Sequence, residues 1–593
     1  MLALRRRPST GGTVTGLAVA LASALLFARA AEASLHRAPP DTVLYNGKVS
    51  TVDARGSTVQ AVAIRDGEIL ATGGNRKITA LATRSTRVLN LRGRRVLPGL
   101  IDGHLHGLRN GYHCFSQAVR LDNVTSRSQA LSLYGRKAAQ LADGRWIFTT
   151  TGWTINQLDQ PGMFTLAELD AAAPSNPVWV NGFRFQGVQV NSAALAAAGL
   201  QAGMPGVSLD AGGRPTGQLT GPALAKAGSA VLAQMDAMTI EQQALCLRDF
   251  IRAANALGLT GWNDPEGNLQ PFNPAGSCQE FATGGHGHQP VLQLWRRNRL
   301  DARIAFHLMN DFSGLSQVLA DTRHVLGFLG DDRLRYLGVG EEVVCPGNQP
   351  PPAAEYLEIS KHLASNRLSF ENHASASETQ AAILDAWEQA DRIFPISGLI
   401  WTIAHPGEDA VGPTTETLAR ARALGIGMTP STGGALGRAP TGGPAEPGAQ
   451  GTTPPFRRML ESGVRMCLST DAMNVAPFTP FAKLWFATSG QTFDPNVRGV
   501  PADQRLTREQ ALRASTVECA WNLGQEGRTG SIERGKHADL IVVNRDYFRV
   551  PLNDIRKLRS VLTIVGGGVV HAQGRFGQFS RGPVAARPSG VAQ

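Results

Sequence analysis

The sequence predicts an α/β protein, and two features of the chain support that class. Eight short apolar runs have the length of buried strands, and helix-like stretches such as residues 128–141 and 240–257 accompany them. Several of the runs end in histidine or aspartate, so the carboxyl ends of the predicted strands carry polar side chains. The strand-like runs are residues 96–106, 259–264, 302–309, 336–344, 368–373, 399–405, 426–430 and 464–471.

The first run reads Val-Leu-Pro-Gly-Leu-Ile-Asp-Gly-His-Leu-His and ends in His104 and His106. Side chains alternate along a strand, so two histidines two residues apart point to the same side. Their imidazoles can converge on one cation, and imidazole is a preferred ligand for zinc and its neighbours. A lone His-x-His pair is also common in ordinary loops, so this pair needs support from elsewhere in the chain.

Three later runs supply that support, because they end in His373, His405 and Asp471. Four strand ends that offer His-x-His, His, His and Asp in this order are far more specific than any one of them. The sequence therefore predicts a metal site that is built from His104, His106, His373, His405 and Asp471.

With these residues the chain resembles the amidohydrolase superfamily, and within it amidohydrolase family 3, the YtcJ-like proteins. The resemblance extends over about residues 41–574. It implies a distorted (β/α)8 TIM barrel with a metal centre at the strand ends, and eight strands are the number that closes such a barrel. It also implies that Asp471 takes the proton of the attacking water and later protonates the leaving nitrogen. His405 is the second candidate catalytic residue.

Both ends of the chain carry short strand-like runs that are punctuated by glycine. Residues 41–95 and 525–575 resemble the composite β-sandwich that amidohydrolases build from their two termini. We expect the barrel to occupy residues 96–524, with an inserted subdomain at 107–257 directly after the first barrel strand. Residues 576–593 form a tail.

The fourth barrel strand departs from a common family pattern. Gly340 stands where many members have a lysine, which becomes carboxylated and bridges two metals. Glu341 or Glu342 could bridge instead, but only one of them can face inward because neighbouring strand side chains oppose. A buried inward carboxylate is costly without a cation nearby. We assign the bridge to Glu341 and keep Glu342 as the alternative.

A second His-x-His pair, His286 and His288, lies in a glycine-rich connection with no accompanying ligands. The sequence predicts a loop there rather than a second metal site.

The metal set predicts the chemistry. A divalent cation lowers the pKa of water towards about 7 and polarises a carbonyl group. We therefore expect hydrolysis of a non-peptide C–N bond in a small amide or N-acyl substrate, with zinc as the cofactor and one or two ions per chain. The alternatives are a mononuclear deaminase-type hydrolase and a catalytically degenerate exported binding protein. About two, one and no metal ions per chain would distinguish the three.

Composition excludes some partners and leaves others open. Hydrophobic residues make up 42% of the chain and charged residues 18%, which is typical of a globular protein. The formal net charge is +11, but no Lys/Arg run with interleaved aromatics occurs, which argues against nucleic-acid binding. The six cysteines show no metal-binding spacing. Their pairing and a homo-oligomeric state stay open.

The N-terminus predicts export. Arg5, Arg6 and Arg7 precede an apolar run over residues 15–27, which is followed by two small-x-small cleavage options. We expect residues 1–33 to be a signal peptide and the mature protein to be periplasmic or secreted. The apolar run is short for a membrane span, and an uncleaved anchor helix is the alternative.

Overall fold

The structure is a computed structural model that describes most of the chain between residues 38 and 579. The described residues are 38–112, 117–150, 152–181, 188–265, 287–308, 314–341, 343, 350–407, 412–432, 454–472, 477–495, 497 and 499–579. The predicted signal peptide and most of the predicted tail lie outside them.

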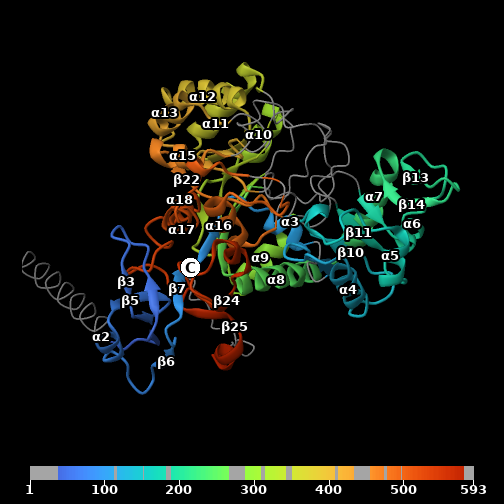
Figure 1. The fold of residues 1–593 in the computed structure, drawn as a ribbon. Helices are drawn as coiled ribbons and strands as arrows, with labels where there is room; N and C mark the ends of the chain where they lie inside the picture. Colours follow the sequence, from blue (N-terminus) through green and yellow to red (C-terminus); the bar gives the residue numbers. More distant parts are fainter. Residues whose placement is uncertain are drawn as a thin grey trace, which may run out of the picture.

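One curled parallel sheet forms the centre of the molecule (Figure 1). All eight strand-like runs of the sequence contribute to it, and neighbours in the sheet follow the order of the chain. The strands are β8 (Leu100–Asp102), β15 (Leu259–Asp264), β16 (Arg303–Leu308), β18 (Leu334–Val339), β19 (Ser369–His373), β20 (Thr402–Ala404), β21 (Gly427–Thr429) and β22 (Arg465–Met466). The short strand β17 (Leu329–Gly330) adds to β18 in the antiparallel sense.

Helices pack around this sheet through one continuous apolar core, in which the rings of Phe370, Trp387 and Trp401 contact one another in tilted and edge-on arrangements. The helix α8 (Ile240–Leu257) illustrates why the segments between the strands are helical. It begins at a capping box formed by Thr239 and Gln242 and ends at Gly258, whose φ of 97° glycine tolerates. The others are α3 (Gly107–Tyr112), α9 (Gln289–Arg296), α10 (Gly314–Thr322), α11 (Ala353–Ser365), α12 (Ser377–Asp391), α13 (Thr415–Leu424), α15 (Phe456–Ser462), α16 (Pro480–Ser489), α17 (Arg508–Ala514) and α18 (Val517–Asn522).

The two edges of the curled sheet, β8 and β22, meet without forming a regular ladder. Three backbone hydrogen bonds join the segments that follow them. Gly103 N donates to Leu468 O at 3.2 Å, Asp471 N to His104 O at 2.9 Å and His106 N to Ala472 O at 2.8 Å. This seam brings the first and the last predicted metal ligands together.

Strands from both chain ends share a second, six-stranded sheet of order β25-β24-β23-β7-β2-β3, which lies at the bottom of Figure 1. A four-stranded sheet of order β5-β4-β1-β6 contributes Leu44 and Val62 to an apolar core that also contains Ile564 of the six-stranded sheet. The elements are β1 (Thr42–Tyr45), β2 (Lys48–Ser50), β3 (Thr58–Val59), β4 (Ala61–Arg65), β5 (Glu68–Gly73), α2 (Asn75–Thr79), β6 (Arg87–Asn90), β7 (Arg95–Pro98), β23 (Leu540–Val543), β24 (Ser560–Val565) and β25 (Gly568–Ala572).

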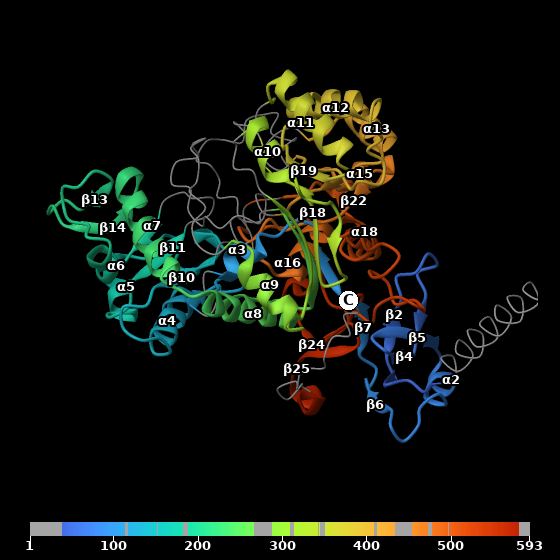
Figure 2. The ribbon, with the colours of Figure 1, turned by 180° about the vertical axis from the view of Figure 1, so that it is seen from behind.

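The segment after β8 contains a third sheet, of order β13-β14-β12-β11-β10-β9, with two apolar cores of its own. It lies to one side of the central sheet in both ribbon views (Figures 1 and 2). Its elements are β9 (Ala118–Val119), α4 (Arg127–Ala138), β10 (Ile147–Thr149), α5 (Leu166–Ala172), β11 (Val178–Asn181), β12 (Val188–Val190), α6 (Ser192–Ala197), β13 (Val207–Leu209), β14 (Pro215–Leu219) and α7 (Gly221–Asp236).

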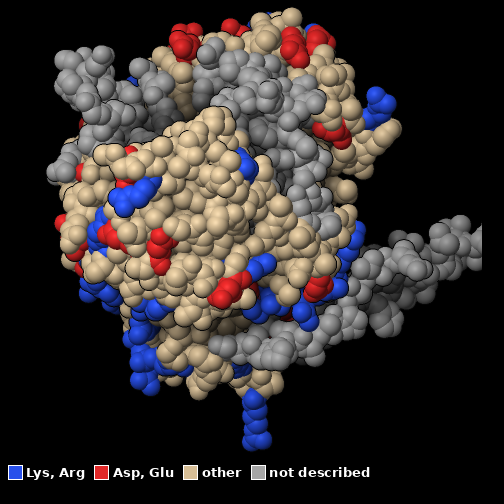
Figure 3. Space-filling view, turned by 90° about the vertical axis from the view of Figure 1, so that its right-hand side faces the viewer, with Lys and Arg blue, Asp and Glu red and all other residues tan. Residues whose placement is uncertain are grey.

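On the face that Figure 3 shows, acidic and basic side chains lie together across the middle, and basic side chains gather along the lower left edge. Within the described ranges, no helix combines the length and apolarity that a membrane crossing needs.

Candidate metal centre

The structure brings the six predicted metal ligands together at the carboxyl ends of the central strands. They follow five different strands or end them, which explains how residues far apart in the sequence meet. All are buried except His373, which is partly buried. The residues are His104 and His106 after β8, Glu341 after β18, His373 at the end of β19, His405 after β20 and Asp471 after β22.

Glu341 lies at the middle of the cluster. Its Oε1 atom lies 2.6 Å from His373 Nδ1 and 3.0 Å from His405 Nε2. Its Oε2 atom lies 3.2 Å from His104 Nε2 and 3.8 Å from His106 Nε2. One carboxylate therefore contacts the imidazoles of three different strand ends. Glu342, the alternative, lies outside the described residues.

Asp471 faces the same imidazoles from the other edge of the sheet. Its Oδ1 atom lies 3.0 Å from His106 Nε2 and 3.8 Å from His104 Nε2, and its Oδ2 atom lies 4.0 Å from His405 Nδ1. Two triads have ligand atoms within 4.8 Å of one another, and they share His104. One triad is His104, Glu341 and His405, and the other is His104, His106 and Asp471.

Two of these residues have a backbone conformation that side chains other than glycine rarely adopt. His405 has a φ of 59° and Asp471 a φ of 54°. Such a conformation costs on the order of 1–3 kcal/mol and persists where the surroundings impose it, commonly at functional sites. The surrounding contacts thus hold both side chains in the cluster.

The ionisation of the cluster follows from its composition. Burial opposes ionisation of Glu341 and Asp471, but the adjacent imidazoles outweigh it. They hold the pKa of Glu341 well below its usual range and lower that of Asp471 to about 2. Burial likewise opposes protonation of His104, yet Glu341 and Glu371 raise its pKa well above the ordinary value.

This donor set fits a divalent cation. Two buried carboxylates and four imidazoles offer the oxygen and nitrogen ligands that zinc prefers. Among the described residues, no lysine or arginine forms an ion pair with Glu341 or Asp471. A bound cation would supply the positive charge that these carboxylates otherwise lack.

Glu371 is a functional residue that the sequence analysis missed. It is fully buried on β19, and its Oε1 atom contacts His104 Nδ1. Its Oε2 atom accepts a hydrogen bond from Asn263 Nδ2. A carboxylate in this position fixes the ring orientation of His104 and directs its Nε2 atom into the cluster. The sequence did hold a signal, because Glu371 precedes His373 by two residues and so faces the same side.

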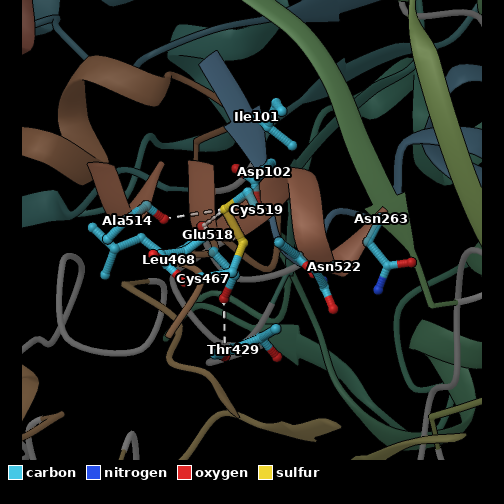
Figure 4. Close-up of a disulfide and its surroundings, with 12 residues drawn as sticks. Ile101, Asp102, Asn263, Thr429, Cys467, Leu468, Ala514, Glu518, Cys519 and Asn522 are labelled. Carbon is cyan, nitrogen blue, oxygen red and sulfur yellow. Dashed lines mark hydrogen bonds between the residues drawn. A yellow bond between two sulfur atoms is a disulfide. The ribbon is translucent and has the colours of Figure 1, made fainter. Parts of the chain in front are cut away.

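A disulfide joins Cys467 and Cys519, and it lies close to Asp102 (Figure 4). It links the segment after β22 to α18, and both cysteines are buried. Nearby, Asn522 Nδ2 donates a hydrogen bond of 2.8 Å to Gly103 O. The sequence left the cysteine pairing open, and the structure ties the strand that leads to Asp471 to the helix that contacts the His104 segment.

The second His-x-His pair does not join the cluster in the described part of the chain. His288 lies at the start of α9 and packs its ring against Phe306, with 4.9 Å between ring centroids. Burial lowers the pKa of His288 to about 4. His286 lies outside the described residues.

The chain is similar to known hydrolases in sequence. A family model described as "Amidohydrolase family" matches residues 87–571. N-substituted formamide deformylase of Arthrobacter pascens is 24% identical over 565 residues, which cover 89% of this chain and 97% of that protein. The putative amidohydrolase YtcJ of Bacillus subtilis (strain 168) is 31% identical over 185 residues, which cover 30% of this chain and 34% of that protein.

Solved structures share the fold. An uncharacterized metal-dependent hydrolase from Pyrococcus furiosus aligns with a TM-score of 0.58 and 20% identity, covering 86% of this chain and 100% of its own. A triazine hydrolase variant aligns with a TM-score of 0.51 and 16% identity, covering 90% of this chain and 94% of its own. From the family match and the full-length relative it follows that the chain belongs to the amidohydrolase family and is a hydrolase that acts on carbon–nitrogen bonds other than peptide bonds.

Proposed function

We propose that the enzyme cleaves the amide bond of a small molecule at a divalent metal centre. The residues that would hold the metal are His104, His106, Glu341, His373, His405 and Asp471. The observation that carries this proposal is the position of Glu341, whose carboxylate lies within 3.2 Å of three imidazoles from three strand ends. Zinc suits this mixture of nitrogen and oxygen ligands best.

A divalent cation held there would lower the pKa of water and polarise the carbonyl of the substrate. Asp471 supplies the proton transfers. Its low pKa keeps it ionised at neutral pH, so its carboxylate accepts the proton that the attacking water loses. Asp471 then returns this proton to the leaving nitrogen, and the C–N bond breaks to give a carboxylic acid and an amine. His106 Nε2 lies 3.0 Å from Asp471 Oδ1, close enough for both atoms to bind one cation.

For the substrate we propose N-substituted formamides and related N-acyl amines. The support is the N-substituted formamide deformylase, whose similarity extends over 97% of its own length. Hydrolysis of such a compound would release formate and a primary amine in equal amounts.

The test is a substrate panel with the zinc-loaded protein. The panel pairs each N-substituted formamide with its N-acetyl analogue and includes cyclic amides, and both products are quantified. We expect formate and amine from the formamides, with slower or no release of acetate. If the loaded enzyme hydrolyses no amide in the panel, the proposed substrate class is wrong.

The role of Glu341 has a matched control in its neighbour. We expect Glu341→Gln to lower both metal content and turnover, and Glu342→Gln to lower neither. If neither variant has an effect, no bridging carboxylate exists, and a mononuclear deaminase-type centre with Asp471 as base becomes the better account.

We also propose that the protein is exported after cleavage near residue 33. The disulfide between Cys467 and Cys519 supports an oxidising compartment. N-terminal sequencing of the mature protein from a bacterial periplasm should find a start close to Ala31 or Ser34. An intact N-terminus on cytoplasmic protein would contradict export.

A further inference from the structure

The seam between β8 and β22 holds a buried lysine that the hydrolytic chemistry does not use. Lys483 lies on α16 and is fully buried. Its Nζ atom donates to Ile101 O and to Leu468 O, each at 2.9 Å. These two carbonyl groups belong to opposite edges of the central sheet, so one ammonium group joins edges that no regular ladder connects.

Asp102 completes this connection. Its Oδ2 atom lies 3.4 Å from Lys483 Nζ. Its Oδ1 atom accepts hydrogen bonds from two backbone amides, His104 N at 3.2 Å and Thr470 N at 2.9 Å. The carboxylate thus binds the backbone of one metal-ligand segment at His104 and of the other at Thr470, the residue before Asp471. Figure 4 shows Asp102 close to the disulfide that links the segment after β22 to α18.

Packing alone does not account for the lysine. Every residue of α16 is buried, and a methionine would fill a similar volume without the cost of burying an ammonium group. Only a group with several donors can join two carbonyl oxygens and a carboxylate at one point.

We propose that Lys483 and Asp102 are positioning residues that set the spacing between His104 and Asp471 across the seam. This inference rests on the proposed function, because it concerns the metal centre that these two ligands build. Within the residues that the structure describes, no strand ladder joins β8 to β22, and the hydrogen bonds of Lys483 and Asp102 connect these two edges next to His104 and Asp471.

The test compares Lys483→Met with Arg303→Met. Arg303 is a matched control because it is also buried and ion-paired, but its partners are Asp539 and Asp332 rather than a metal-ligand segment. The measurements are zinc affinity by competition with a chelator, the absorption spectrum of the cobalt-substituted protein, and unfolding by denaturant. We expect Lys483→Met to raise the zinc Kd by about 10- to 100-fold and to change the cobalt spectrum. Arg303→Met should lower stability and leave the Kd and the spectrum unchanged.

A second variant covers the case in which Lys483→Met does not fold. Asp102→Asn keeps the shape of the side chain but places a neutral amide against the ammonium, and we expect a zinc Kd raised by about tenfold with a changed cobalt spectrum. If wild-type protein binds zinc and the folded variants bind it equally tightly, the positioning role is refuted while the proposed function stands. If wild-type protein binds no divalent metal, the proposed function falls and this inference falls with it.

Discussion

Two clusters of buried charge differ in how they are neutralised. In one, Arg303 on β16 pairs with Asp539 and Asp332. Asp539 also accepts hydrogen bonds from Thr529 Oγ1 at 2.8 Å and Gly566 N at 2.7 Å. In the other, Glu341 and Asp471 face only imidazoles among the partners that the described residues provide.

The Arg303 cluster is complete without a ligand. Burial opposes ionisation of Asp539, but Arg303 outweighs it and holds the pKa of Asp539 well below its usual range. The guanidinium is a permanent cation, so this cluster needs no external charge. An imidazole, by contrast, carries a positive charge only when it is protonated, and it binds a metal ion when it is neutral. A buried carboxylate paired with arginine therefore indicates structure, whereas buried carboxylates among histidines indicate a metal.

The sharpest test of this contrast is His104→Ala combined with His106→Ala. We expect the double variant to lose bound metal and to reduce turnover to background, because His104 belongs to both ligand triads. Metal content is measured by elemental mass spectrometry on the purified protein. Full metal content in the double variant would rule out this cluster as the metal site.

Asp471→Asn tests the proton transfers separately from folding. The amide has the same shape but cannot take a proton, so we expect kcat to fall by about 10³-fold. Steady-state kinetics with a hydrolysed formamide would measure this loss, and circular dichroism would verify the fold. Turnover within a few-fold of wild type would assign the proton transfers to another group.

Asp539→Asn tests the structural cluster. Removing one partner of a buried ion pair costs about 3 kcal/mol, so the free energy of unfolding should fall by that amount at pH 7 while turnover of the folded protein is unchanged. Because the folded-state pKa of Asp539 lies below its usual value of 3.8, its contribution is fully present above that pH and is lost as the pH falls towards the folded-state pKa. The difference between wild type and variant should therefore shrink below about pH 4. Denaturant unfolding at a series of pH values measures it, and a constant difference would contradict the assignment.

The smallest expected effect is that of Glu371→Gln. Glutamine keeps the contact with Asn263 but orients His104 less strongly, so we expect zinc affinity to fall by about tenfold with little loss of stability. Competition with a chelator measures the affinity. An unchanged affinity would show that His104 needs no carboxylate behind it.

Most of the metal ligands could be predicted from the sequence, because they lie at the ends of strand-like apolar runs. His104, His106, His373, His405 and Asp471 could be predicted because each ends an apolar run. Glu371 faces the same side as His373, but it lies two residues before the end of its run, so the prediction from run ends did not include it. The choice between Glu341 and Glu342 stayed open because alternation alone does not say which neighbour faces inward.

Other features could be recognised only in the folded structure. Lys483 appears in the sequence as a single charge within an apolar helix, and only the fold shows which carbonyl groups it joins. The pairing of Cys467 with Cys519 has no signal in the spacing of six scattered cysteines. The sheet after β8, whose strands are two to five residues long, was also not anticipated.

Because both chain ends share one sheet, this sheet can form only late during synthesis of the chain. Arg94 Nη1 donates to Asn544 O, a residue 450 positions later, and His106 contacts Asp471 across 365 positions. The N-terminal strands leave the ribosome first. Their edge backbone groups therefore stay unpaired until almost the whole polypeptide has been made. A site assembled from such distant segments is complete only after nearly the whole polypeptide has been made.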